Sequence, residues 1–235
     1  MRASSASSRS GPPEALDAST RAVVDAAIAR LRDDGFVAYA TETVWGLGAC
    51  ADRPVAIDRL MQWKGRGSDA PLAVLVPSAA NASLLDSVES LGCRVGDPAR
   101  RLMDAFWPGP LMLVLPCERE WAPGVTRAGG ALGVRCSSNS LSSQLAAALA
   151  EAGLGPLTST SFNRTGAPPA TTGSEAAALT QRDAASLAEP LLIDLPGQDA
   201  GGERPSTVVD CTNRDYAVLR EGAIAADEIA SVISG

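Results

Sequence analysis

The stretch FVAYATETVWGLGAC at residues 36–50 sets the architecture of this chain. Its two apolar segments, 36–40 and 44–50, have the short, bounded apolar character of buried strands. The polar triplet TET (41–43) directly follows the first of them, where hydroxyl groups can orient a small polar substrate. The same hydroxyls would also suit a plain turn. The two glycines of VWGLG let another backbone approach the second strand closely.

Helices and strands alternate on both sides of this stretch. A helical apolar period runs over 20–34, with Ser19 or Thr20 as its N-cap and Gly35 as its end. Further helices are predicted from 52–54 to 61 and over 97–103, 141–152 and 226–233. Further strands are predicted over 72–76, 111–115, 131–136, 157–161, 191–195, 206–211 and 216–221. Short loops join some neighbouring strands, so the pattern predicts an α/β fold with a mixed parallel and antiparallel sheet.

The chain is interpreted as one domain behind a tail. Residues 1–18 (MRASSASSRSGPPEALDA) are rich in Ser, Ala and Pro without an apolar period, which predicts disorder. No repeat or linker divides residues 19–235, which we interpret as a single catalytic domain. No apolar run reaches the roughly 18–20 residues that cross a bilayer. A soluble, cytoplasmic protein with no membrane partner is therefore expected.

The composition excludes several kinds of chemistry. The absence of histidine removes Ser-His-Asp triads, imidazole acid–base catalysis and histidine-ligated metals. Five widely spaced cysteines without a C-x-x-C pair are expected to be reduced, buried thiols: Cys50, Cys93, Cys117, Cys136 and Cys211. No haem, flavin or zinc is expected. The net charge of −7, from 27 acidic and 20 basic residues, disfavours a broad nucleic-acid surface but permits a small basic pocket.

The only lysine of the chain, Lys64, is separated from Arg66 by one glycine in WKGRGSDAPL (63–72). Cations at a helix C-terminus complement the helix dipole, which would by itself explain both residues. Two cations in a glycine-rich loop before a strand also make a phosphate clamp, although it is not a Walker loop. Both interpretations stay open at this point.

Other polar side chains stand at the ends of predicted strands. Arg135 closes the strand 131–136, and Ser206 and Arg220 open and close two adjacent strands. The segment TSTSFNRTGAPP (158–169) contributes hydroxyls and an amide from Ser159, Ser161 and Asn163. A Ser/Thr-rich loop is commonly just solvated, but arginines at separate strand ends of an acidic domain are harder to explain in that way. FWPGPLMLVLP (106–116) reads as a rigid apolar turn that shapes a pocket wall.

In their order and spacing, these segments resemble the YrdC-type family, the threonylcarbamoyl-AMP synthases. The resemblance rests on TETVWGLG, KGRGSDAPL, FWPGPLMLVLP, LGVR, STSFNRTGAPP, STVVD and LREG, and runs from about Ala22 to the C-terminus. It implies a twisted open α/β sheet around a deep concave cavity. It also implies condensation of L-threonine, bicarbonate and ATP, with Mg²⁺, to threonylcarbamoyl-AMP and pyrophosphate. The product would supply the machinery that makes N6-threonylcarbamoyladenosine in tRNA, with a weak contact to tRNA itself.

The same resemblance implies roles for individual residues. The threonine side would consist of Thr43, Arg135, Ser159 and Ser206. The ATP side would consist of Arg66, Ser161, Asn163 and Arg220. Lys64, Arg66 and Arg135 would be the catalytic cations, and the metal ligands stay unassigned.

This chain departs from the family pattern at three positions, which puts ATP affinity in question more than reaction type. Ala70 stands where Asn or Lys is usual, Leu75 where some members have a polar residue, and Pro169 where a hydroxyl is common. Two other functions therefore remain open. One is a module that binds RNA ends or a nucleotide without turnover, and the other is carbamoyl-adenylate chemistry on a different acceptor.

Overall fold

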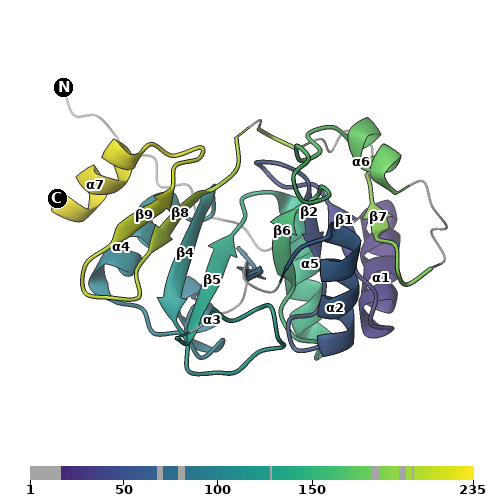
Figure 1. Ribbon diagram of the computed structural model, residues 1–235, viewed down its shortest axis with the longest axis horizontal. Coiled ribbons are helices and arrows are strands. Elements are labelled where there is room, and N and C mark those ends of the chain that lie inside the picture. Colours follow the sequence, from purple (N-terminus) through teal and green to yellow (C-terminus); the bar gives the residue numbers. More distant parts are fainter. Residues whose placement is uncertain are drawn as a thin grey trace.

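One sheet runs through the molecule (Figure 1). The computed structural model describes residues 17–67, 71–78, 83–127, 129–180, 186–195, 200–202 and 204–235. Within these ranges nine strands pair in the order β7–β1–β2–β6–β3–β5–β4–β8–β9. They are β1 (Val37–Tyr39), β2 (Gly46–Gly48), β3 (Ala73–Val76), β4 (Leu111–Pro116), β5 (Ala131–Cys136), β6 (Thr158–Ser161), β7 (Leu191–Ile193), β8 (Thr207–Asp210) and β9 (Ala217–Arg220). The pairs β1–β7, β3–β5 and β4–β8 are parallel and the others antiparallel, which confirms the predicted mixed sheet.

Helices cover both faces of this sheet. Those in the described ranges are α1 (Ala18–Arg32), α2 (Pro54–Lys64), α3 (Leu84–Glu89), α4 (Asp97–Phe106), α5 (Ser140–Glu151), α6 (Gly173–Leu179) and α7 (Ala226–Ser234). Apolar residues of α1 and α5 pack in one cluster, and those of α2, α3, α4 and α7 pack in another. Strand residues of β1 and β3 belong to both clusters, so this part of the sheet is buried between two apolar layers, whereas β9 at the sheet edge is largely exposed.

The sheet order divides the molecule into two halves joined by β3. Figure 1 shows β1, β2, β6 and β7 with α1, α2 and α5 in one half, and β4, β5, β8 and β9 with α4 and α7 in the other. Alternation along β1 sends Val37 and Tyr39 to the α1–α5 cluster and Ala38 to the other. A Cβ on Gly48 would lie 2.2 Å from the carbonyl oxygen of Thr158, so the close approach predicted for the GLG strand is confirmed.

Helix ends were harder to predict than strands. Asp17, not Ser19 or Thr20, caps α1, because its carboxylate accepts hydrogen bonds from both of their backbone N–H groups at 2.9 and 3.0 Å. The short helices α3 and α6 were not predicted. Residues 1–16 of the expected tail lie outside the described part of the chain, whereas Ala18 already belongs to α1.

The expectation for the cysteines is confirmed. All five are free and buried. Burial raises the pKa of Cys50, Cys136 and Cys211 to about 12, so these thiols stay protonated at neutral pH. In the part of the chain that the structure covers, no helix has the length and apolar character to cross a membrane.

Candidate active site

The predicted motifs meet at a cavity of about 310 Å³ between the two halves of the sheet. That volume lies at the lower end of the range for small-molecule sites. Its described wall comprises Thr41, Thr43, Val44, Trp45, Gly46, Arg66, Pro71, Ala73, Met112, Arg135, Ser159, Thr160, Ser161, Pro169, Pro205, Ser206 and Arg220. Seven of the nine predicted site residues are therefore on one wall.

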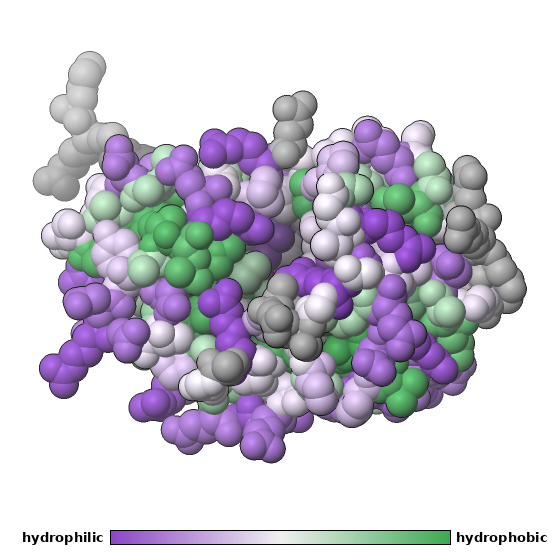
Figure 2. Space-filling model, in the orientation of Figure 1, coloured by the Kyte–Doolittle hydropathy of each residue, from purple (hydrophilic) through white to green (hydrophobic). Residues whose placement is uncertain are grey.

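Figure 2 shows hydrophilic residues along the boundary between the two halves of the sheet and an apolar area over β8 and β9, where Leu219 is 48% exposed.

The end of α2 delivers Arg66 to this wall. Gly65 has φ 65°, the left-handed conformation that ends helices, and its N–H and that of Arg66 bond back to the last turn. The chain then turns so that the Arg66 guanidinium donates to Thr160 Oγ1 at 3.0 Å. Its Nε has no hydrogen-bond partner among the residues described. Arg66 thus keeps donor capacity for a ligand.

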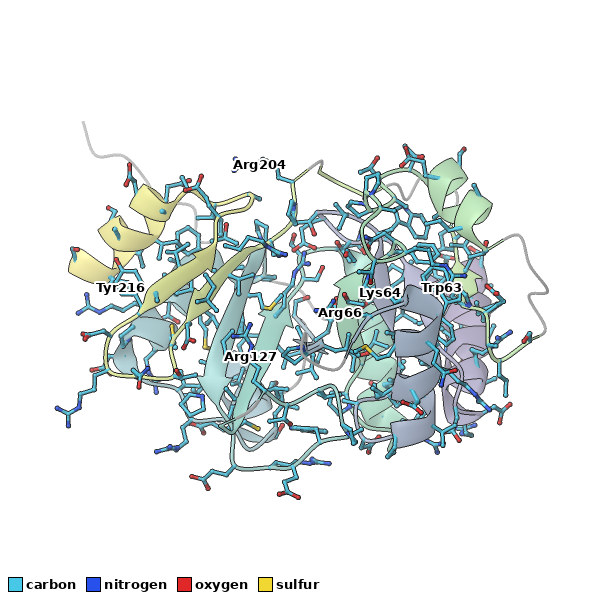
Figure 3. The ribbon with its side chains drawn as sticks, viewed as in Figure 1. Trp63, Lys64, Arg66, Arg127, Arg204 and Tyr216 are labelled. Atoms are coloured by element: carbon cyan, nitrogen blue, oxygen red, sulfur yellow. The ribbon has the colours of Figure 1, made fainter. Side chains whose placement is uncertain are left out.

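Lys64, two residues before Arg66, lies behind the cavity wall. Its ammonium is buried and donates to the carbonyl of Ser161, to the carbonyl of Asn163 at 3.1 Å and to Asn163 Oδ1 at 2.8 Å. These bonds occupy all three donors of an ammonium group. Figure 3 labels Lys64 and Arg66 at the α2 and β6 side of the molecule, with Arg66 nearer its centre. Lys64 therefore ties α2 to the loop after β6, and Asn163, also behind the wall, is part of that tie.

The loop after β6 has further supports. Asn163 Nδ2 donates to Ala167 O at 2.6 Å, and Ser161 Oγ donates to Asn163 Oδ1 at 2.7 Å. The Arg164 guanidinium stacks over Trp63 with its Cζ 4.0 Å from the ring centroid. The polar run that sequence reasoning chose is thus largely a self-bonded scaffold that presents Ser161 to the cavity.

Arg135 comes from the middle of the sheet. In β5, Leu132 and Val134 enter the core under α4, so Arg135 faces the opposite side. It lies in register between Leu75 of β3 and Met112 of β4. Leu75 packs with α1 and α5 and is absent from the cavity wall, so the departure at that position does not touch the site.

Arg135 and the hydroxyls after β1 form a directed chain of hydrogen bonds. Arg135 Nη2 donates to Thr43 Oγ1 at 3.0 Å. Thr41 Oγ1 donates to Val44 O at 2.7 Å, so the 3.0 Å contact between the two threonine hydroxyls takes its proton from Thr43. The hydroxyl proton of Thr43 is therefore already committed, and this group meets a ligand as an acceptor.

The third arginine arrives on the edge strand β9. A register shift between Val208 and Val209 of β8 leaves Arg220 opposite Val208, as expected where a bulge redirects a side chain. Its guanidinium donates to Ser206 O at 2.8 and 3.2 Å. The hydroxyl of Ser206 is buried without a hydrogen-bond partner in the described structure. Ser206 thus keeps a free hydroxyl and Arg220 keeps unused N–H donors on the wall of the same cavity.

The wall is strongly cationic at one end. Burial, and next the charge of Arg220, lowers the pKa of Arg66, while burial and Arg135 lower the pKa of Arg220. Arg220 is therefore close enough to both Arg66 and Arg135 for the positive charges to repel. Burial and Arg66 also lower the pKa of Lys64 to about 8. No carboxylate belongs to the described wall, so a bound anion would relieve this repulsion.

Two larger grooves lie elsewhere. One of about 860 Å³ is lined by Arg94, Asp97, Arg101 and Arg214. Arg94 pairs with Glu118 at 3.4 Å and Arg101 donates to Ile233 O at 3.1 Å, so two of its cations already have partners. The other, about 690 Å³, includes Leu75 and Trp121. Neither groove contains a residue of the predicted site, and we place the chemistry in the smaller cavity.

Of the FWPGP turn and the strand after it, only Met112 lines the cavity. The turn instead joins strands, since Gly109 N–H donates to Cys136 O and Pro110 O accepts from Thr207 N–H. Pro169 does belong to the wall, whereas Ala70 lies outside the described residues.

The site also contains residues that sequence reasoning did not select. Thr160 holds Arg66, and Glu42 pairs with Arg135 at 2.9 Å. Both lie inside motifs that had been quoted. The signal for Glu42 was an acidic residue directly after a buried strand, in a chain segment otherwise made of hydroxyls.

Fold and cavity together define an α/β protein with three arginines converging on one pocket. The Sua5/YciO/YrdC family model, described as "Telomere recombination", matches residues 29–222, and the chain belongs to this family. It is 33% identical over 208 residues to the threonylcarbamoyl-AMP synthase of Bacillus subtilis (strain 168), which covers 88% of this chain and 55% of that protein. It is 33% identical over 193 residues to the threonylcarbamoyl-AMP synthase of Alkalilimnicola ehrlichii, covering 82% and 92%.

The fold is shared with a solved structure as well. The crystal structure of Pyrococcus abyssi Sua5 complexed with L-threonine superposes with a TM-score of 0.77 at 29% identity, over 94% of this chain and 59% of that one. The chain thus spans somewhat more than half the length of the B. subtilis and P. abyssi relatives. The predicted family and the predicted α/β fold are confirmed.

Proposed function

We propose that this chain is an L-threonylcarbamoyladenylate synthase, a nucleotidyltransferase that condenses L-threonine, bicarbonate and ATP to threonylcarbamoyl-AMP and pyrophosphate. The observation that carries the proposal is the convergence of Arg66, Arg135 and Arg220 on one cavity without a carboxylate on its described wall. Guanidinium groups stay charged and bind carboxylate and phosphate through a planar fork. The names of the relatives and the threonine complex of P. abyssi Sua5 support the same assignment.

The reaction needs no protein nucleophile. The amine of threonine bonds to the carbon of CO₂ released from bicarbonate and gives up a proton, which forms a carbamate. A carbamate oxygen then bonds to the α-phosphorus of ATP, and the bond to the bridging oxygen breaks as pyrophosphate leaves. Positioning and electrostatic stabilisation can supply the catalysis. This fits a chain without histidine.

We assign the residues to two sides of the cavity. Thr43, Arg135, Ser159 and Ser206 hold threonine and the carbamate. Arg66, Ser161 and Arg220 hold the phosphates of ATP. Arg66 and Arg135 act as the catalytic cations. Lys64 and Asn163 act through the loop that they brace, because the Lys64 ammonium has no donor left for substrate.

Mg²⁺ fits this site only through oxygen atoms that are not carboxylates. The described residues hold no group of three or more Cys, Asp or Glu that could bind a metal. Mg²⁺ commonly keeps several waters and binds substrate phosphates, and hydroxyls such as that of Ser161 would be its protein ligands here. When bound, the ion would neutralise charge on the departing pyrophosphate.

We further propose the cellular setting. The predicted catalytic domain of residues 19–235, extended to Asp17 by the cap of α1, acts as one unit in the cytoplasm. The adenylate passes to the proteins that transfer threonylcarbamoyl to adenosine of tRNA. Contact with tRNA itself is weak, because the net charge is −7.

The test is mass spectrometry of the product from ATP, ¹³C-bicarbonate and L-threonine. We expect labelled threonylcarbamoyl-AMP, with pyrophosphate released only when all three substrates are present. Arg66→Ala should reduce the product, and Arg127→Ala, which removes a cation outside the cavity, should not. ATP consumption without threonine would instead indicate another acceptor. Binding of ATP without consumption would indicate a non-catalytic module.

A further inference from the structure

Glu42 lies directly behind Arg135. Its Oε1 is 2.9 Å from Arg135 Nη2, well within ion-pair distance. Its Oε2 accepts a hydrogen bond from Ser137 Oγ. The side chains of Glu42 and Arg135 are only 16% and 8% exposed. The pair is therefore a largely buried charge pair on the edge of the cavity.

The carboxylate of Glu42 is fixed in place by the start of α5. Ser137 Oγ also accepts from Ser142 Oγ at 2.8 Å and from Asn139 N–H at 3.2 Å. Asn139 caps α5 by accepting from Ser142 N–H at 3.1 Å. Burial would raise the pKa of Glu42, but Arg135 and the Ser137 hydrogen bond outweigh it, and the net pKa is lowered. Glu42 is therefore ionised at neutral pH.

The other two arginines of the cavity lack such a partner. Arg66 bonds to the hydroxyl of Thr160, and Arg220 bonds to the carbonyl of Ser206, both neutral groups. No Asp or Glu among the described residues lies within ion-pair distance of either guanidinium. Arg135 with Glu42 thus sums to zero charge, whereas Arg66 with Arg220 sums to +2.

We propose that Glu42 is a positioning and specificity residue that keeps the Arg135 end of the cavity neutral. A neutral end accepts a zwitterionic amino acid, whose ammonium three unpaired arginines would repel. It also attracts phosphate less than the +2 end does, so the polyphosphate chain is confined to Arg66 and Arg220. That the amino acid is threonine rests on the proposed function. The charge asymmetry itself does not.

The test measures binding without turnover. Calorimetric titration of Glu42→Gln with L-threonine should show an affinity about ten- to a hundred-fold weaker, because the uncompensated charge of Arg135 then repels the ammonium of the amino acid. Titration with inorganic pyrophosphate should show an affinity at least several-fold tighter, with pyrophosphate now competing against threonine. If Glu42 had a purely structural role, Glu42→Gln would not bind any ligand more tightly than the wild-type protein does. Unchanged or weaker pyrophosphate binding overturns the proposal.

Two matched variants sharpen the result. Glu118→Gln removes a carboxylate that pairs with Arg94 far from the cavity, so it controls for net charge and should change neither affinity. Glu42→Asp keeps the charge but shortens the side chain. It should weaken the binding of L-threonine while leaving the affinity for pyrophosphate at the wild-type level. Tighter pyrophosphate binding in either of these variants overturns the proposal. Glu42→Asp also supplies this test if Glu42→Gln folds poorly.

The two arms also separate this proposal from the proposed function. If the wild-type protein binds pyrophosphate but no L-threonine, the assignment of the substrate fails. The comparison of pyrophosphate affinity between wild type and Glu42→Gln still decides the role of Glu42.

Discussion

The two sides of the cavity are built in different ways. Arg135 projects from β5 in the interior of the sheet and is held by a carboxylate and a hydroxyl chain. Arg66 follows the last turn of α2 and is held by one bond to Thr160. A strand bonded on both sides fixes its side chain, whereas a loop needs a separate brace. On the Arg66 side that brace is Lys64.

This difference teaches that two cations separated by a single residue in the sequence can have opposite roles. All three N–H donors of Lys64 bond to the protein, which braces the loop that carries Ser161. Arg66 makes a single hydrogen bond to the protein, so most of its N–H donors remain available to an anion. The following predictions test this division, from the largest expected effect to the smallest.

Lys64→Met should have the largest effect. It removes the Lys64 donor from the backbone carbonyls of Ser161 and Asn163, and each unsatisfied group costs about 1–3 kcal/mol. Asn163 Oδ1 keeps the hydrogen bond that it accepts from Ser161 Oγ. A shift of the loop by about 1 Å can cost about a hundred-fold in rate. We therefore expect a clear fall in thermal midpoint together with a fall of about a hundred-fold or more in kcat/KM for ATP. Unchanged stability would show that the brace is unimportant.

Replacement of threonine by serine tests the Arg135 side. Serine keeps the carboxylate and the hydroxyl and lacks only a methyl group, which is worth about 1–3 kcal/mol in an apolar pocket. Serine should therefore be a real substrate about ten- to two-hundred-fold poorer in kcat/KM. Valine keeps the shape without the hydroxyl and should be poorer still. Pyrophosphate release at saturating ATP measures all three, and better turnover of valine than serine would contradict the placement of Thr43 and Ser206.

Arg66→Ala should separate catalysis from folding. The side chain makes one hydrogen bond, to Thr160, and no ion pair in the described structure, so its loss should change the thermal midpoint little. Loss of a charge-assisted contact to phosphate costs about 1.5–3 kcal/mol, or roughly ten- to a hundred-fold in kcat/KM for ATP. The opposite result, a lower midpoint with normal kinetics, would mean that Arg66 only stabilises the end of α2.

Much of this architecture was readable from the sequence. The strand 131–136 was predicted with its observed bounds, because alternating apolar residues between clear turns leave little choice. The helix α6 was missed although Thr172 and Glu175 form a capping box, a signal that the sequence contains. The helix α3 has six residues with only Val88 buried, so it gives almost no apolar period.

The sequence predicted which residues gather at the site, but not which of them face the cavity or what they contact. Seven of the nine residues reach the wall because the family motifs occur at the ends of neighbouring elements. Sequence could not tell that Lys64 faces away, because that depends on where the helix ends and on the left-handed turn at Gly65. Nor could it show that Glu42 meets Arg135, since the two are 93 positions apart and meet only in the folded sheet.

Titration of Lys64 should change activity and stability in opposite directions as the pH rises. Burial and Arg66 lower its pKa from 10.5 to about 8. Above about pH 8 the neutral amine has fewer donors for the loop, so this residue should lower kcat/KM for ATP by up to about tenfold per pH unit. Between about pH 8 and 10.5 the unfolded chain binds more protons at this residue, so its contribution to stability rises with pH.

The matched control for this pH effect is Lys64→Arg, which stays charged throughout the range. Its activity should show no decline of this kind, whatever its level at pH 7. Parallel loss of activity and thermal midpoint in the wild-type protein would indicate general alkaline unfolding, and would contradict the prediction.

The smallest expected effect, none at all, concerns the thiols. Cys136 follows Arg135 in β5, but alternation places its side chain in the core on the opposite face of the sheet. Burial also raises its pKa to about 12, so the reactive thiolate is scarce. N-ethylmaleimide under native conditions should leave pyrophosphate release unchanged, and Cys136→Ser should behave as the wild type does toward the reagent. Rapid inactivation that L-threonine prevents would place a thiol in the cavity. It would then follow that β5 is not the rigid support on which the Arg135 side depends.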